Sequence, residues 1–362
     1  MEFNDIKAQQ AIIKEHLDER IKKVLDHGKY IMGPEIFELE ERLQAYTNSK
    51  HCITVSSGTD ALLISLMAIG IKPGDEVITT PFTWVSTAEV IAFLGAIPLF
   101  ADIEPDTCNI DVTKIKDLIT DKTKAIIPVS LFGQPSDLDE INFIAEDNNL
   151  TVIEDAAQSF GATYKKKKSC ALSKIGCTSF FPSKPLGGYG DGGAIFTDDD
   201  DIAQISKELR VHGAEKNHWY TNIGVAGRMD TLQAAIILAK LENFPWEVDQ
   251  RINIGSRYNK ILDEKSVKRV KQKKDRTSVF AQYTIFTDKR DELIRFLSSK
   301  NIPTAIHYMH PVNSSPAYSE YCRDNTPQSD NVSKKVLSLP MHPYLSESDQ
   351  DFITESVIEA SG

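Results

Sequence analysis

The sequence lacks the features that define several large classes of proteins. It has no apolar run near the ~20 residues that a membrane-spanning helix needs. Its start, Met-Glu-Phe-Asn-Asp, lacks the basic and apolar regions of a signal peptide. The 362 residues carry a formal net charge of −11, which argues against nucleic acid or an anionic membrane surface as the main partner. A few well-placed arginines would still allow a small anionic substrate.

Cysteine and metal-binding patterns are also sparse. The chain has 5 cysteines, none of them in a C-x-x-C pair. We therefore expect reduced thiols in a cytoplasmic protein rather than disulfides or a zinc site. His307 and His310 follow an apparent strand and have no acidic neighbour, so no metal is expected there either.

The chain does have the rhythm of an α/β protein. From His51 onward, short apolar runs alternate with helical segments, which is typical of a layer built on a mostly parallel sheet. The expected strands are 52–55, 76–79, 97–101, 125–129, 151–153 and 195–197. The expected helices are 5–27, one that opens at Pro34, 60–69, 86–94, 112–119, 138–148, 199–212 and 229–241.

The length of the chain allows two domains. We expect a large domain over residues 1–245, with an N-terminal helical arm over 1–48, and a smaller C-terminal α+β domain over 246–362. The smaller domain would begin with a long helical segment through Trp246 and Tyr258. Its other expected elements are a solvated charged loop (265–276), strands 279–286 and 304–307, and helices 290–300 and 347–359.

The most unusual stretch is Ser-Phe-Phe-Pro-Ser-Lys-Pro-Leu-Gly-Gly-Tyr-Gly-Asp-Gly-Gly, residues 179–193. Apolar residues flank its one lysine, Lys184. Because desolvation disfavours an ammonium, Lys184 could act as a nucleophile near neutral pH. The glycines let the backbone approach another group closely. A surface lysine in a glycine-rich turn is the alternative.

The glycines of this stretch do not form a dinucleotide-binding loop. Residues 188–193 satisfy the pattern G-x-G-x-x-G. However, they precede an expected strand, whereas that fingerprint needs a strand before it and a helix after it.

Two other stretches carry chemistry at the ends of expected strands. Residues 56–59, Ser-Ser-Gly-Thr, lead into a helix, where free amides and the helix dipole would suit a phosphate. The alternative is a cap that only completes the helix. Residues 154–158, Glu-Asp-Ala-Ala-Gln, place two carboxylates at the edge where open α/β sheets bind ligands. An ordinary strand-ending turn is the alternative there.

Together these pieces match the needs of one cofactor, pyridoxal 5′-phosphate (PLP). Lys184 would form the Schiff base, Asp155 would keep the pyridine nitrogen protonated, and the helix that follows Ser57 would bind the phosphate. The three signals also occur in the order that such enzymes use.

At these residues the chain resembles the DegT/StrS-type sugar-nucleotide aminotransferases, which are fold type I PLP enzymes. The resemblance covers nearly all of the chain. Besides residues 179–193, it rests on motifs at residues 57–62 (SGTDAL), 73–78 (PGDEVI), 154–159 (EDAAQS), 228–235 (RMDTLQAA) and 339–344 (LPMHPY).

The resemblance implies roles for particular residues. Lys184 would be the catalytic lysine that bonds to PLP and moves the proton. The other implied cofactor contacts are Gly58, Thr59, Asp60 through its backbone, Trp84 stacked on the ring, Asp155, Gln158 and Ser179. An aromatic side chain at position 84 would also suit plain core packing. The implied contacts to the nucleotide sugar are Arg228, His307 and Tyr308, some of them across the interface of a homodimer.

The stretch 179–193, together with Ile306-His-Tyr308, is similar to a narrower group of the family. Those enzymes use L-glutamate to aminate UDP-2-acetamido-2-deoxy-3-oxo-glucuronate for surface polysaccharides such as O-antigen. The alternatives are another keto sugar nucleotide, aminated at C4 or linked to dTDP, and a non-catalytic regulator on the same fold. A dehydratase of this family would carry histidine in place of Lys184.

One position departs from the family pattern. The family usually has an asparagine two residues before Arg228, where it reaches the phosphate bound by the neighbouring subunit; here the residue is Ala226. A hydrogen bond to a charged group contributes roughly 1.5–3 kcal/mol. We therefore predict that Ala226→Asn slows the loss of PLP from the protein. Equal cofactor dissociation rates for the two proteins would contradict this prediction.

Overall fold

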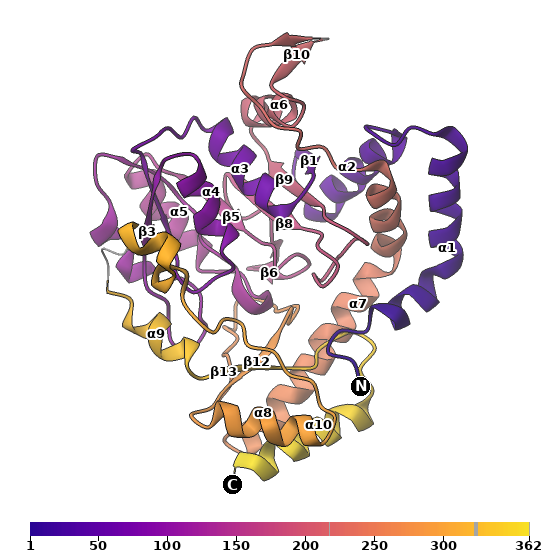
Figure 1. The fold of residues 1–362 in the computed structure, drawn as a ribbon, viewed down its shortest axis with the longest axis vertical. Helices are drawn as coiled ribbons and strands as arrows, with labels where there is room; N and C mark the ends of the chain where they lie inside the picture. Colours follow the sequence, from indigo (N-terminus) through magenta and orange to yellow (C-terminus); the bar gives the residue numbers. More distant parts are fainter. Residues whose placement is uncertain (217, 322–324, 362) are drawn as a thin grey trace.

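The computed structural model describes residues 1–216, 218–321 and 325–361 (Figure 1). These residues form a seven-stranded sheet in the order β1-β9-β8-β5-β4-β2-β3. The strands are β1 His51–Val55, β2 Glu76–Thr79, β3 Ile97–Phe100, β4 Thr123–Ile126, β5 Thr151–Asp155, β8 Ile175–Ser179 and β9 Gly193–Thr197.

The sheet is mostly parallel, as predicted. The pairs β2–β3, β2–β4, β4–β5 and β5–β8 are parallel, and β9 runs antiparallel to its neighbours β8 and β1. Because parallel strands end at the same edge of a sheet, the last residues of β5 and β8, Asp155 and Ser179, lie at one edge. This edge is where the predicted site residues gather.

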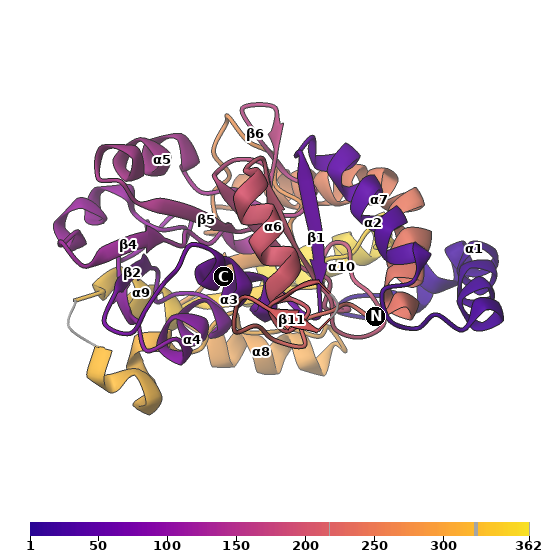
Figure 2. The ribbon, with the colours of Figure 1, turned by 90° about the horizontal axis from the view of Figure 1, so that it is seen from above.

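Helices cover both faces of the sheet. On one face, α3 (Gly58–Ala68) and α6 (Asp200–Leu209) pack in a cluster with buried side chains of β1, β5 and β8. On the other face, α2 (Pro34–Thr47) and α7 (Thr231–Glu264) pack against phenylalanines that the sheet and its loops contribute. Figure 2 shows α1, α2 and α7 together at one end of the sheet.

Two predictions of secondary structure are wrong. Residues 112–119, expected as one helix, form short 3₁₀ turns at Val112–Lys114 and Lys116–Leu118. The β-branched side chains there disfavour a helix, and Asp111 accepts a hydrogen bond from the Thr113 amide at 2.9 Å, which favours a local turn. Residues 304–307, expected as a strand, make only a single bridge between Ala305 and Ser338.

Three features were not predicted. Strand β8 lies in the middle of the sheet, but its sequence Ile-Gly-Cys-Thr-Ser contains a single large apolar residue. The other two are short hairpins, β6–β7 (Thr163–Tyr164 and Lys167–Lys168) and β10–β11 (Ala214–Lys216 and Trp219–Tyr220). The β10–β11 hairpin projects from the top of the molecule in Figure 1.

A single long helix joins the two predicted domains. Helix α7 runs for 34 residues and passes through Pro245 without ending. The expected boundary at residue 245 lies inside this helix, so the division of the chain into domains stays a prediction. Beyond it, β12 (Tyr283–Phe286) and β13 (Val336–Leu339) pair antiparallel and pack with α8 (Arg290–Ser299) and α10 (Glu347–Ser361).

A buried carboxylate links the sheet to the C-terminal part. Asp102, which is 6% exposed, accepts hydrogen bonds from the Gln328 amide at 2.8 Å and from the Ser329 amide at 2.9 Å. These amides belong to the first turn of α9 (Pro327–Ser333), where a carboxylate satisfies backbone donors that have no helical partner.

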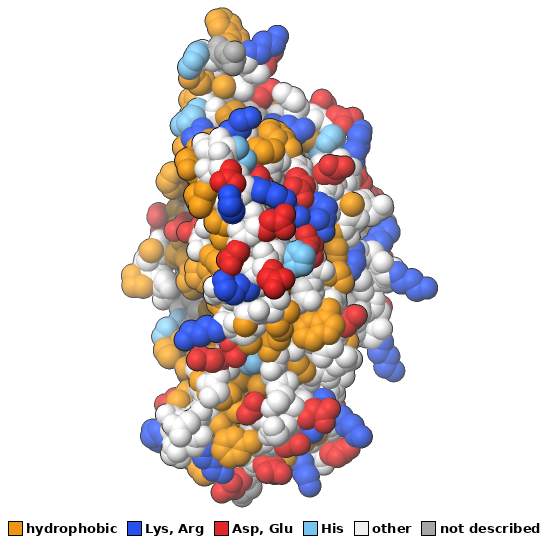
Figure 3. All heavy atoms as spheres, turned by 90° about the vertical axis from the view of Figure 1, so that its right-hand side faces the viewer, with side chains coloured by type: hydrophobic (Ala, Val, Ile, Leu, Met, Phe, Trp, Pro, Cys, Tyr) orange, Lys and Arg blue, Asp and Glu red, His pale blue; other side chains and the backbone are white. Residues whose placement is uncertain are grey.

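The expected N-terminal arm consists of α1 (Ile6–His27) followed by α2. Buried Ile13 and Leu17 of α1 pack against Ile236 and Ala239 of α7. On the face that includes α1, acidic and basic side chains are interspersed (Figure 3), and α1 itself carries i,i+4 ion pairs such as Lys14–Asp18. No helix of the described residues is long and apolar enough to cross a membrane.

Candidate active site

The turn between β1 and α3 has the geometry of both of its predicted roles. Ser57 caps α3, since its hydroxyl accepts the Asp60 amide at 3.0 Å. The amides of Gly58 and Thr59, in the first helical turn, have no acceptor within the helix. A Cβ on Gly58 would lie 2.6 Å from the Ser179 Cβ. The Asp60 amide therefore completes the cap, while Gly58, Thr59 and Ser179 stand together with donors free for an anion.

The glycine-rich stretch brings the chain back against this turn. A Cβ on Gly193 would lie 2.4 Å from the Ser57 carbonyl oxygen, so only glycine fits there. Earlier in the stretch, the Tyr189 amide donates to Gln233 Oε1 of α7 at 2.9 Å. The glycines lead directly into strand β9, as predicted, and not into the helix that a dinucleotide-binding loop requires.

Asp155 ends β5 as a buried carboxylate, 7% exposed. Its Oδ2 accepts the Thr87 hydroxyl at 2.9 Å, and its Oδ1 accepts the Ala157 amide at 3.2 Å. Burial raises the pKa of Asp155, while these two hydrogen bonds and the positive charge of Lys184 oppose the rise. The carboxylate thus has one donor on each oxygen and a cationic neighbour.

Lys184 is partly buried in the loop after β8. Burial lowers the pKa of its amine, and the attraction of Asp155 partly offsets this. Among the described residues its amine makes no hydrogen bond or ion pair. The pKa shift has the direction that the flanking apolar residues predict, and it increases the fraction of free amine that can act as a nucleophile or base.

Gln158, Tyr308 and Trp84 form one polar and aromatic wall of the site. The Gln158 side chain accepts the Phe132 amide at 2.9 Å and donates to the Tyr308 hydroxyl at 3.0 Å. The Trp84 ring lies 6.2 Å from the Tyr308 ring, and Trp84 is 58% exposed. This exposure rules out plain core packing for Trp84 and leaves its ring free to cover a ligand.

His307 lies beside Tyr308 and interacts electrostatically with Lys184. Its Nδ1 is 3.0 Å from the Ser338 hydroxyl. Burial, and then the charge of Lys184, lower the pKa of His307 to about 4. The imidazole is therefore neutral at physiological pH. Because Nδ1 pairs with Ser338, Nε2 is the nitrogen left to contact a substrate.

Arg228 follows a loop that lies against the turn of residues 56–59. The carbonyl of Gly227 accepts the Ser56 amide at 2.8 Å. Within the described part of the chain, the Arg228 guanidinium makes no hydrogen bond or ion pair. Ala226 is exposed in the same loop. A free guanidinium beside this site suits a carboxylate or phosphate, which it can bind with two parallel hydrogen bonds.

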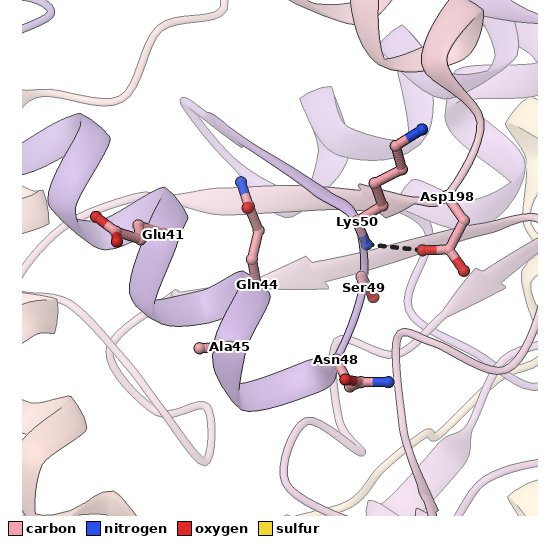
Figure 4. A pocket seen from close by; sticks show the side chains of 7 residues that line it. All are labelled: Glu41, Gln44, Ala45, Asn48, Ser49, Lys50 and Asp198. Atoms are coloured by element: carbon pink, nitrogen blue, oxygen red, sulfur yellow. Dashed lines mark hydrogen bonds between the residues drawn. The ribbon is translucent and has the colours of Figure 1, made fainter.

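A surface hollow of about 690 Å³ lies elsewhere and contains none of these residues (Figure 4). It is lined by the end of α2, the turn that precedes β1, and Asp198. The Lys50 amide donates to Asp198 there at 2.7 Å. Over the ranges that the structure describes, no group of three or more His, Cys, Asp or Glu side chains is placed to hold a metal ion.

The structure adds residues that sequence reasoning missed. Thr87 contacts Asp155 and Ser338 contacts His307. Thr87 lies three positions after Trp84, which is one helical turn, and that spacing was a usable signal. Ser338 comes from β13, 31 residues after His307, so no local pattern could have pointed to it.

A buried Asp at a strand end, an unpaired lysine with a lowered pKa and a helix N-terminus at one sheet edge define the site of a PLP-dependent enzyme. The residues suit PLP in their chemistry, with an acceptor for the ring nitrogen, amides for the phosphate and an amine for the aldehyde. The chain belongs to the DegT/DnrJ/EryC1/StrS aminotransferase family, which it matches over residues 11–358.

Individual relatives agree with this placement. The chain is 50% identical to UDP-2-acetamido-2-deoxy-3-oxo-D-glucuronate aminotransferase of Pseudomonas aeruginosa, over 95% of this chain and 96% of the relative. It is 40% identical to a pleiotropic regulatory protein of Geobacillus stearothermophilus, over 98% and 97% of the two chains. The solved structure of NtdA from Bacillus subtilis, with bound cofactor PMP, is 31% identical with a TM-score of 0.90, over 96% and 82%. The protein is a PLP-dependent aminotransferase.

The pKa shifts of two histidines predict how the stability of the protein depends on pH. The pKa values of His307 and His342 are lowered to about 4, mainly by burial. The unfolded chain binds these protons near pH 6.5 and the folded protein does not. The stability that the neutral rings contribute is therefore present above pH 6.5 and lost as the pH falls toward 4.

We predict that His342→Gln flattens this dependence by as much as about 1.4 kcal/mol per pH unit, measured by urea unfolding from pH 7 to 4. His310→Gln is the matched control, since His310 is exposed, and it should leave the slope unchanged. A His342→Gln slope equal to that of the parent protein would refute the assignment.

Proposed function

We propose that this aminotransferase moves an amino group from L-glutamate to the 3-keto carbon of a UDP-linked 2-acetamido-3-oxo-glucuronate. The observation that carries the proposal is the free guanidinium of Arg228 near a site that also holds neutral His307. A uronate adds a carboxylate to the pyrophosphate of a nucleotide sugar, and a guanidinium binds either group well. The 50% identity to the Pseudomonas aeruginosa enzyme supports the same substrate.

The protein's residues divide the work of holding the cofactor and the substrate. Gly58, Thr59 and Ser179 would bind the cofactor phosphate, and Asp155 would pair with the pyridine nitrogen. Trp84 would cover the ring and Gln158 would contact its hydroxyl. When bound, PLP supplies an electron sink for the carbon that loses its proton.

Lys184 does the proton chemistry. Burial lowers the pKa of its amine, so that the free base would be available once glutamate has entered. The amine would then take the proton from the α-carbon of glutamate and hold it for return during the transfer. In the second half of the cycle Lys184 carries a proton in the reverse sense while the keto sugar gains the amine. Arg228, His307 and Tyr308 orient the sugar nucleotide.

The direct test is glutamate-dependent amination of the 3-oxo-uronate nucleotide by the purified enzyme. We predict ping-pong kinetics, with parallel double-reciprocal lines, because one product leaves before the second substrate binds. Lys184→Ala should keep bound PLP or its amine form and lose turnover. Intersecting lines, or full turnover by Lys184→Ala, would contradict the proposal.

Two other functions would use the same fold. The enzyme could aminate a different keto sugar nucleotide, at C4 or linked to dTDP, and parallel assays with those sugars separate the cases. A non-catalytic regulator is the second candidate, because the Geobacillus stearothermophilus relative carries a regulatory name. The presence of Lys184, Asp155 and Gln158 favours catalysis. A purified protein without PLP absorbance would favour the regulator.

We also propose that the enzyme is a cytoplasmic homodimer with shared active sites, working in surface-polysaccharide (O-antigen) synthesis. The β10–β11 hairpin and the loop after it expose large side chains: Trp219 is 68% exposed, Tyr220 58% and Ile223 91%. Exposed apolar groups that cluster in this way are typical of protein interfaces. The loop that carries them leads directly to Ala226 and Arg228.

A dimer would have a mass of 80.8 kDa, twice 40.4 kDa. Light scattering measures this mass in solution. We predict that Ile223→Asp shifts the protein toward the monomer, since it would bury a charge in the interface. Phe143→Asp is the matched control, because Phe143 is 60% exposed on α5 (Leu138–Asp147), away from the hairpin (Figure 1). A monomeric parent protein, or equal shifts by both variants, would count against the dimer.

A further inference from the structure

The start of helix α4 (Ser86–Phe93) joins three parts of the site that lie far apart in the sequence. Trp84 precedes the helix and covers the site from one side. The Ser86 hydroxyl lies 2.8 Å from that of Thr59, in the turn of residues 56–59. The Thr87 hydroxyl donates to Asp155 at 2.9 Å. One helical turn therefore contacts both ends of the cofactor site.

The hydrogen bond from Thr87 to Asp155 has a defined direction. A hydroxyl carries a single proton. The acceptors within reach of Thr87 are Asp155 Oδ2 at 2.9 Å, the Thr83 hydroxyl at 3.3 Å and the Trp84 carbonyl at 3.4 Å. The carboxylate is nearer and charged, so it takes the proton. The Thr83 hydroxyl, 3.3 Å from that of Thr87, must then be the donor to Thr87. The result is a relay from Thr83 to Thr87 to Asp155.

The two threonines of this relay are shielded from solvent. Thr87 is 1% exposed and Thr83 is 3% exposed, so water does not compete for their hydroxyls. Within the described residues, the side-chain carboxylate of Asp155 receives one other hydrogen bond, from the Ala157 amide at the longer distance of 3.2 Å. Loss of the Thr87 hydroxyl would leave one oxygen of a buried carboxylate without a donor, which is costly.

We propose that Thr87 is a positioning residue of the enzyme: its hydroxyl orients the Asp155 carboxylate and keeps it ionised for the pyridine nitrogen. The proposal rests on the role given to Asp155 in the proposed function. With Oδ2 fixed by Thr87 and Oδ1 by Ala157, the carboxylate cannot rotate, and its remaining lone pairs point in set directions. The burial that raises the pKa of Asp155 is opposed in part by Thr87.

The test compares Thr87→Val, which keeps the shape of the side chain and removes the hydroxyl, with Thr87→Ser, which keeps the hydroxyl. The measurements are the rate at which the holoenzyme loses PLP on dilution and the pH dependence of the absorbance of bound PLP. Thr87→Val should lose PLP about tenfold faster or more, as expected for a lost hydrogen bond to a charged group. Its absorbance titration should also shift. Thr87→Ser should remain close to the parent enzyme in both.

Thr79→Val is the matched control. Thr79 is also buried, at 0% exposure, but its hydroxyl donates to the Ile127 carbonyl at 2.8 Å and not to a site residue. This variant should lose thermal stability and keep the PLP dissociation rate and the titration of the parent. Equal effects of Thr79→Val and Thr87→Val would overturn the proposal, because the loss would then be merely structural.

Asp155→Asn separates failure of this proposal from failure of the proposed function. If Asp155→Asn loses PLP rapidly and Thr87→Val does not, the role of Thr87 is overturned and that of Asp155 stands. If Asp155→Asn retains PLP like the parent, both roles are overturned. Failure of Thr87→Ser to restore retention would also count against Thr87.

Discussion

The site depends on the close approach of two backbone segments at one edge of the sheet. A Cβ on Gly193 would collide with the Ser57 carbonyl, and a Cβ on Gly58 would collide with Ser179. These glycines let the first residue of β9, the last residue of β8 and the N-terminus of α3 meet. Without these close approaches, the turn of residues 56–59 and the glycine-rich stretch 179–193 would not meet. The parallel strands then bring Asp155 to the same edge.

Burial at this edge shifts the pKa values of three side chains of the site. Burial lowers the pKa of Lys184 and of His307, and it raises that of Asp155. Asp155 and Lys184 limit each other's shift because they attract. The outcome is a carboxyl group whose rise in pKa two hydrogen bonds oppose, an amine with a larger free-base fraction and an imidazole without charge. This combination suits a cofactor that needs a protonated ring nitrogen and a nearby base.

Much of the fold was predictable because its signals are local. The alternation of apolar runs and helical segments predicted a mostly parallel α/β sheet, and the structure confirms it. Local rules failed where tertiary contacts decide. Strand β8 has little apolar character and is a strand because β5 and β9 flank it. Residues 304–307 make a single bridge to β13, and the side chains of His307 and the next residue, Tyr308, then contact Ser338 and Gln158. Residues 112–119 form short 3₁₀ turns, which local hydrogen bonds favour over a helix.

The class of site is predictable from local stretches of the sequence. A lysine among apolar residues, a carboxylate at a strand end and a hydroxyl-rich turn before a helix are chemical requirements of PLP, and each is readable from neighbouring residues. How those groups are held depends instead on contacts between distant parts of the chain. Thr87 and Ser338 reach Asp155 and His307 from distant parts of the chain, and Gln233 of α7 supports the glycine-rich loop. Such contacts depend on how helices and strands pack, and packing joins residues that no local pattern connects.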